Sequence, residues 1–185
     1  MAGLKFRVLL DTDSDNEIFR DILIDDQDNF ESFYKSIVNS FNFSGNEMAS
    51  FYVSNDSWDK GFEISLMDLS YEDDDIDAPA SIMKNAIIKN YLEEPDQKFI
   101  LVYDFMRMWI FLIELIGYEK EGPQTPQLLL SVGGAPPEDS KSAEDNENMF
   151  VGDIDEEDEF GYDGYDDDYD EEDLGGYEKY DEYDY

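Results

Sequence analysis

The chain has 185 residues, enough for one ordinary domain with some residues to spare. It carries 49 acidic and 12 basic residues, a formal net charge of -37 at neutral pH. Because it has neither Cys nor His, disulfides, the usual zinc ligands and the commonest general base are excluded. Carboxylate, Lys and Tyr chemistry remains.

The acidic charge is distributed unevenly. Residues 138–185 hold 23 acidic and 2 basic residues, whereas residues 1–137 hold 26 acidic and 10 basic residues. Apolar periodicity also stops in this last part, where blocks of Asp and Glu alternate with Gly and Tyr. Such a sequence buries too little apolar surface to offset the entropy of ordering the chain. We therefore predict a folded domain at 1–139 and a disordered acidic tail at 140–185.

Hydropathy and charge also bear on the location of the protein and on its partners. The longest wholly apolar run, residues 108–113, is too short to span a bilayer, and the first residues show no signal-peptide pattern. We expect a cytoplasmic protein without a membrane partner. Direct nucleic-acid binding is disfavoured because residues 1–137 are themselves net negative.

The first elements are two strands. Residues 4–11 alternate apolar and polar side chains, and residues 18–24 resume the apolar pattern after a polar turn. A hairpin is expected. Asp11, Asp13 and Asp15 in this turn copy the first half of a calcium loop, but Ile22 stands where a bidentate Glu is needed. We predict a solvated turn and no metal site.

The clearest element is a helix at residues 29–42. Its apolar side chains recur at helical spacing on one face: Phe30, Phe33, Tyr34, Ile37, Val38 and Phe41. Asp28 followed by Glu31 resembles a capping box, and Ser44-Gly45-Asn46 ends the helix.

The rest of the domain is predicted mainly as strands. The expected elements are strands at 48–53 and 61–66, an acidic loop at 72–77, a short helix at 81–91, strands at 98–105 and 109–115, and a last strand at 127–132. The strands at 98–105 and 109–115 are apolar at nearly every position, which is typical of central strands covered on both faces. The predicted fold is therefore α+β, a mixed or mostly antiparallel sheet with one main amphipathic helix packed on it.

Three segments of the chain are similar to those of one known family. Arg20 and the strand around it, followed by the helix, resemble the opening of the plasmid pRiA4b Orf-three-like domain family. Tyr103-Asp104-Phe105 and, after three residues, Trp109 resemble its Tyr-Asp-Phe-Gly-Asp-x-Trp hairpin. The segment from Gly133 through Pro136, Pro137, Glu138 and Asp139 resembles its Gly-rich Pro-Pro-Glu-Asp motif.

The chain also departs from that family. The Gly and acidic positions of the hairpin are Met106, Arg107 and Met108, and the positions after the Trp are Ile110 and Phe111. The resemblance implies a divergent Bacteroidetes-type member, a plasmid or transposon passenger protein without an established activity. It also implies that much of any polar site at the hairpin has been replaced by apolar groups.

The function expected from these observations is a non-enzymatic interaction or accessory module without a cofactor. The acidic tail would either engage a basic protein or maintain solubility. One alternative is a metal-dependent enzyme using Asp104 and nearby carboxylates, although a buried Asp often accepts backbone hydrogen bonds instead. Another is small-ligand binding near Trp109.

Overall fold

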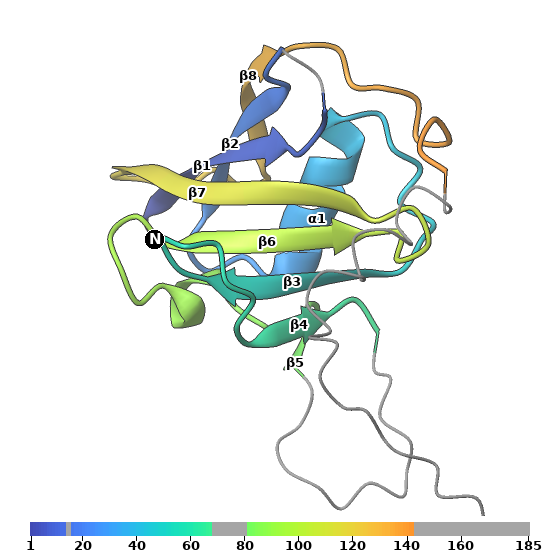
Figure 1. The fold of residues 1–185 in the computed structure, drawn as a ribbon. Coiled ribbons are helices and arrows are strands. Elements are labelled where there is room, and N and C mark those ends of the chain that lie inside the picture. Colours follow the sequence, from blue (N-terminus) through green and yellow to red (C-terminus); the bar gives the residue numbers. More distant parts are fainter. Residues whose placement is uncertain (14–15, 68–80, 143–185) are drawn as a thin grey trace, which may run out of the picture. The chain divides into compact units, whose positions relative to one another are not determined.

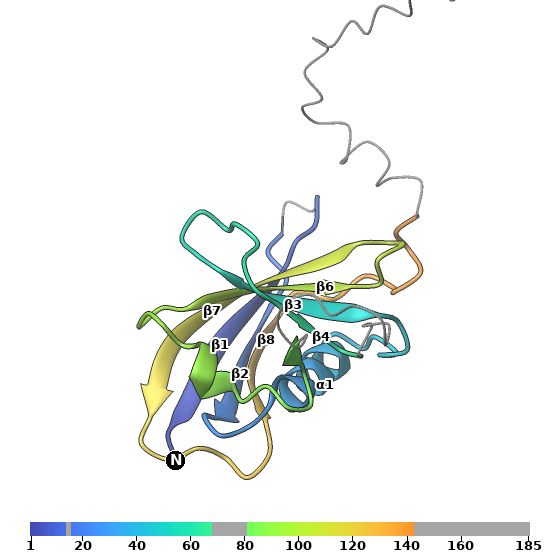
Figure 2. The same ribbon diagram turned by 90° about the horizontal axis from the view of Figure 1, so that it is seen from below.

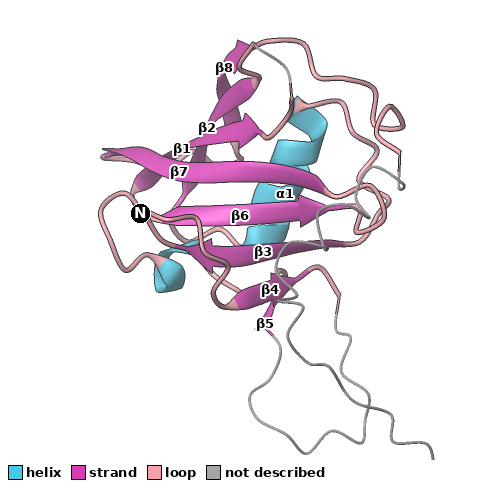
Figure 3. Ribbon diagram, in the orientation of Figure 1, coloured by secondary structure: helices cyan, strands magenta, loops and turns pink. Residues whose placement is uncertain are grey.

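The computed structural model describes residues 1–13, 16–67 and 81–142 (Figure 1). These residues form one eight-stranded sheet, one α-helix and a short 3-10 helix (Figure 3). The strands are β1 (Gly3–Leu10), β2 (Phe19–Asp25), β3 (Ala49–Ser54), β4 (Glu63–Ser65), β5 (Ser81–Ile82), β6 (Lys98–Tyr103), β7 (Trp109–Glu119) and β8 (Gln127–Val132). The helices are α1 (Phe30–Ser40) and η1 (Ile88–Tyr91). The predicted α+β class is confirmed.

The strands lie in the order β5–β4–β3–β6–β7–β1–β2–β8. Neighbours are antiparallel throughout this order except for β4 and β5, which are parallel, so the sheet is mixed and mostly antiparallel as predicted. The hairpin of β1 and β2 is also confirmed, with Leu4 opposite Ile24 and Leu9 opposite Phe19. At the far end of the sheet, β8 pairs with β2.

Helix α1 packs on one face of this sheet (Figures 1 and 2). The apolar stripe predicted from the sequence is the buried face of the helix: Phe30, Phe33, Tyr34, Ile37 and Val38. The ring of Phe33 lies 4.8 Å from that of Phe6 on β1 and stacks at 5.8 Å on that of Phe51 on β3. The helix therefore joins both halves of the sheet through aromatic contacts.

The start of the helix differs from the prediction. Asn29, and not Asp28, is the N-cap, because its side-chain oxygen accepts a hydrogen bond from the amide of Ser32 at 2.9 Å. Asp28 contributes its backbone carbonyl to the amide of Ile88 instead. The helix also ends earlier than predicted, at Ser40, with Asn42 in the left-handed region at φ 60°.

The predicted helix at 81–91 is wrong. Its first two residues form β5, where Ser81 pairs with Ile64 of β4, and only residues 88–91 coil into η1. A further bridge joins Ile87 to Asn29. Backbone N–H and C=O groups that would bond to one another within a helix are thus paired with neighbouring segments instead.

The expected burial of two central strands holds for one of them. On β6, Ile100 and Val102 point to the face of the sheet that α1 does not cover. They are nevertheless buried, with 4% and 1% of their surface exposed. On β7, the equivalent residues Ile110 and Leu112 are half-buried. This strand also continues beyond the predicted end at residue 115 to Glu119, since β1 pairs with it from Phe111 to Glu119.

Three predicted features lie outside the described residues: Asp15 of the turn after β1, the acidic loop at 72–77 and residues 143–185 of the tail. The domain contacts reach slightly beyond the predicted boundary at 139, because Lys141 donates a hydrogen bond to the carbonyl of Met108 at 2.7 Å. In the part of the chain that is described, no helix has the length and apolar character needed to cross a bilayer.

Replacing Phe33 by Ala should lower the free energy of unfolding by about 3–5 kcal/mol, because the substitution opens a cavity between α1 and the sheet. Chemical denaturation followed by circular dichroism measures the change. Lys35→Ala is the matched control on the same helix, since this side chain is 62% exposed and should change stability by less than about 0.5 kcal/mol. Equal stabilities of the two variants would contradict the packing described.

Candidate functional site

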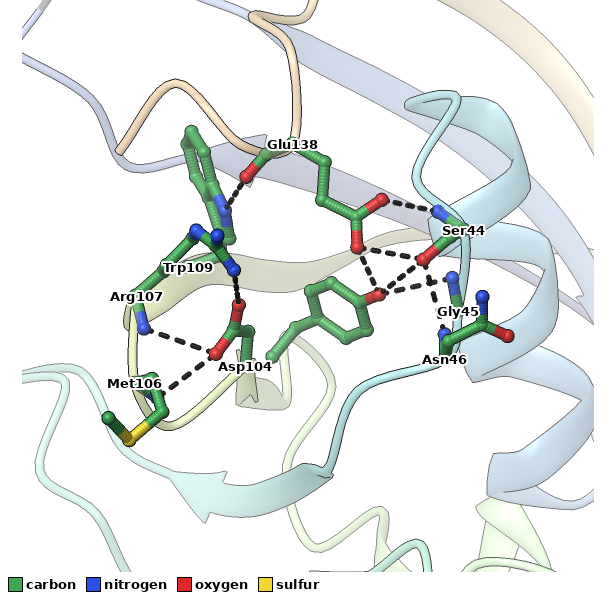
Figure 4. A network of polar contacts seen from close by, with 9 residues as sticks. Ser44, Gly45, Asn46, Asp104, Met106, Arg107, Trp109 and Glu138 are labelled. Carbon is green, nitrogen blue, oxygen red and sulfur yellow. Dashed lines mark hydrogen bonds and ion pairs between the residues drawn. The ribbon is translucent and has the colours of Figure 1, made fainter. Parts of the chain in front are cut away.

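The second and third family-like segments meet at one end of the sheet. They are the β6–β7 turn with its flanking residues and the segment that follows β8, residues 133–141, which we call the C-terminal segment (Figure 4). The loop after α1 lies against both. This meeting point is the candidate site.

Glu138 is the centre of the contacts. One carboxylate oxygen accepts from the amide of Ser44 at 2.6 Å, and the other accepts from the Ser44 hydroxyl at 2.9 Å and from the Tyr103 hydroxyl at 2.5 Å. The oxygen of Tyr103 in turn accepts from the amide of Gly45 at 3.1 Å (Figure 4). One carboxylate therefore joins the C-terminal segment to the loop after α1 and to the end of β6.

The electrostatics of the pair favour this arrangement. Burial alone would raise the pKa of Glu138, but hydrogen bonds from Tyr103 and Ser44 outweigh it and lower that pKa below its usual value. Burial, together with the bond to Glu138, raises the pKa of the Tyr103 hydroxyl. At neutral pH the carboxylate is thus ionised and the phenol protonated, so acceptor and donor match.

Trp109 fastens the same segment from the other side. Its indole nitrogen donates to the backbone carbonyl of Glu138 at 3.0 Å, and its ring packs 5.2 Å from that of Phe43. The ammonium of Lys141 lies 5.6 Å from the indole ring. Trp109 was predicted to lie near a small-ligand site, but with 3% of its surface exposed it offers almost no ring face to a ligand.

Asp104 shapes the β6–β7 turn. It is 2% exposed and sits in the left-handed region at φ 57°. One carboxylate oxygen accepts from the amides of Met106 and Arg107 at 3.0 and 3.2 Å, and the other accepts from the Arg107 guanidinium at 2.9 Å. These bonds occupy three of the roughly four acceptor positions of the carboxylate. Among the described residues, no three acidic side chains gather as a metal ion would require.

Arg20 lies at the opposite end of the C-terminal segment. Its guanidinium is buried and donates to four backbone carbonyls, those of Phe19, Ser40, Val132 and Gly133, at 2.8–3.1 Å. Ser40 is the last residue of α1, where the helix dipole favours a cation. Burial lowers the pKa of the guanidinium, and these carbonyls offset part of the lost hydration.

Gly133 begins the C-terminal segment at a position that only Gly fits. Its φ is +73°, and a Cβ placed there would lie 2.8 Å from the carbonyl oxygen of Glu17 and 3.1 Å from the Cα of Ile18. The chain can therefore turn away from β8 against the β1–β2 turn. Arg20 holds the segment at this turn, and Glu138 holds its other end.

The remaining predicted residues lie at the margin of the site. Phe105 is 41% exposed on the turn, Pro136 is half-buried, and Pro137 and Asp139 are exposed. Sequence reasoning missed Ser44 and Lys141. Ser44 belongs to a stretch recognised only as the end of the helix, and no periodic signal marks a loop side chain that binds a residue 94 positions away.

Breaking the Tyr103–Glu138 contact should destabilise the domain in a coupled manner. We expect Tyr103→Phe and Glu138→Gln each to cost about 1–3 kcal/mol. The double variant should cost less than the sum, with a coupling of about 0.5–3 kcal/mol. Denaturant unfolding of all four proteins measures the cycle. The exposed Tyr52–Glu63 pair, at 3.1 Å, is the matched control and should show little coupling. Additive effects at Tyr103 and Glu138 would contradict the contact.

The pH dependence of stability follows from the direction of the Glu138 shift. Because its pKa is lower in the folded than in the unfolded chain, its stabilising contribution is fully present above about pH 4.5 and is lost as pH falls through the folded pKa. Glu138→Gln should therefore lose less stability than the natural protein between pH 5 and pH 3. Unfolding free energies across this range measure the difference, with the exposed Glu94→Gln as control. Parallel curves for Glu138→Gln and the natural protein would refute the assignment.

Comparison with known proteins places this architecture in a family. No curated protein matches the chain. The crystal structure of a protein of unknown function, MM3350 from Methanosarcina mazei Go1, superposes with a TM-score of 0.60 at 21% sequence identity, covering 84% of each chain. At that identity the likeness shows a shared fold. The family model described as plasmid pRiA4b ORF-3-like protein matches residues 2–175, nearly the whole length of the chain. The chain therefore belongs to the plasmid pRiA4b ORF-3-like family.

Proposed function

We propose that this protein is a non-enzymatic interaction module whose acidic C-terminal residues engage basic protein partners. The observation that carries the proposal is the concentration of charge after Pro137, where 48 residues hold 23 acidic and 2 basic side chains. The electrostatic attraction between these residues and a positively charged surface acts over about 8 Å at physiological salt.

Binding of this kind depends on many weak contacts. A single exposed ion pair contributes about 0–1 kcal/mol, so affinity requires several pairs formed together. The tyrosines interleaved with Asp and Glu in residues 162–185 add cation–π contacts with Arg, worth about 0.5–1 kcal/mol at exposed sites. The expected partner therefore has an extended surface rich in Arg or Lys.

The chemistry of the folded domain supports the non-enzymatic part of the proposal. The polar side chains of the family-like motifs use their hydrogen-bonding capacity within the domain: Glu138 and Tyr103 bind each other and the loop after α1, and Asp104 binds its own turn. Such contacts build a surface and leave no activated base or nucleophile among these motif residues.

A salt series tests the proposal directly. Binding of the full chain to a polyarginine surrogate, measured by fluorescence anisotropy, should weaken steeply from low to moderate ionic strength. A full-length variant with the acidic residues of 153–173 changed to Asn or Gln should lose the binding. The matched control changes the exposed Glu93, Glu94 and Asp96 of the domain in the same way and should retain it.

The surrogate establishes polyanion behaviour, and partners recovered from the native host establish function. We expect those partners to elute with rising salt and to be absent from the neutralised variant. Partners that stay bound to the neutralised variant at high salt would overturn the proposal. The acidic residues would then only maintain solubility.

A further inference from the structure

Strand β8 presents an apolar edge to solvent. Three consecutive leucines on it, Leu128, Leu129 and Leu130, are 49%, 47% and 44% exposed. On one side β8 pairs with β2, and among the described residues no strand pairs with its other side. Leu128 and Pro126 also line a groove against α1. Exposed apolar edge strands are sites at which another strand adds to a sheet.

The charge pattern around β8 is unlike that of the rest of the protein. From Gly122 to Pro137 there are 16 successive residues without a charge, the longest such stretch in a chain whose residues are 33% charged. Natural edge strands are commonly protected by Lys or other charges. Gln127–Val132 has no such protection.

We propose that β8 is the interface of a homodimer, in which the strand pairs antiparallel with β8 of a second copy about a two-fold axis. This inference goes beyond the proposed function and does not depend on it. An isologous contact of this type closes after two subunits, so it yields a dimer and not a fibre.

The absence of charge on β8 favours a second copy as the occupant. Two chains of net charge -37 repel wherever their acidic surfaces face each other, and an uncharged strand is where they can approach at least cost. A basic partner would find no acidic side chain along β8 to pair with. An uncharged, leucine-rich strand complements this edge best, and β8 is itself such a strand.

The register within β8 indicates how the contact is held. The register of β8 against β2 shifts between Asp21 and Ile22, so Leu129 is the extra residue of a bulge in β8 and has no partner in β2. Bulges bend a strand and limit the length of a regular ladder. A two-fold axis beside Leu129 places this residue opposite its own copy and Leu128 opposite Leu130 of the partner subunit. Because the bulge limits the regular ladder, packing of these leucines contributes more to the dimer contact than backbone hydrogen bonds do.

Sedimentation equilibrium of the full chain over a concentration series tests the inference. The natural protein should dimerise, and salt should strengthen the dimer because it screens the repulsion between the two chains. This salt dependence is opposite to that expected for a basic partner. Leu129→Lys should weaken the dimer roughly tenfold or more, since it removes apolar contact and places two ammonium groups opposite each other.

The control Met106→Lys adds the same charge at a 70% exposed residue of the β6–β7 turn and should leave the dimer intact. Circular dichroism melts show that both variants are folded. A natural protein that stays monomeric at all concentrations and salts would overturn the inference. An unchanged dimer in folded Leu129→Lys would overturn it as well.

Cysteine substitution locates the contact, because the natural chain has no Cys. Leu129→Cys should form a disulfide-linked dimer under mild oxidation. The Cα atoms of directly opposed residues in antiparallel strands lie about 4.5–5.5 Å apart, a distance that a disulfide can span. Met106→Cys should remain largely unlinked. Equal cross-linking of the two variants would mean that the copies meet elsewhere or only by collision.

Discussion

The packing of the C-terminal segment against the loop after α1 and the end of β6 depends on one carboxylate. Glu138 accepts hydrogen bonds from the amide and hydroxyl of Ser44 and from the hydroxyl of Tyr103, so three distant parts of the chain meet at its two oxygens. A half-buried carboxylate is costly unless its acceptor sites are filled, and here the amide and hydroxyl of Ser44 and the hydroxyl of Tyr103 fill them. The hydrogen bonds to Glu138 join the C-terminal segment to the loop after α1 and to the end of β6. They also explain why a Pro-Pro-Glu-Asp motif that follows the last strand belongs to the folded domain.

Arg20 complements Glu138 at the other end of the same segment, where it holds the residues that leave β8. Neither of these groups forms an ion pair with the other, since Arg20 donates to backbone carbonyls. Both contacts fix the path of residues 133–141 after β8. The uncharged strand, the fastened segment and the acidic stretch thus follow one another along the chain. The first is proposed to bind a second copy, and the last is proposed to bind a basic partner. A dimer would present two acidic stretches, which raises the avidity for a partner with repeated basic patches.

The sequence predicted the elements whose signal is periodic. The stripe from Phe30 to Val38 specified α1 and its buried face, and alternating residues specified the β1–β2 hairpin, because burial on one side imposes a period on the side chains. Residues 81–91 were assigned incorrectly because pairing with β4 and with Asn29 overrides weak local helix preference. The motif residues were identified through family resemblance, but their roles were not. The contacts of Glu138 and Trp109 join residues far apart in sequence, and no local pattern encodes them.

The polar motif residues hold the end of β6, the loop after α1 and the C-terminal segment together. Amide hydrogen exchange at Ser44 and Gly45 tests this most directly, because these two amides donate to Glu138 and Tyr103 although Ser44 itself is exposed. We expect both amides to exchange far more slowly than those of exposed loops. Glu138→Gln should accelerate exchange at both amides while the amides of β6 remain protected. Rapid exchange of Ser44 and Gly45 in the natural protein would mean that the contacts with Glu138 and Tyr103 do not hold this part of the domain together.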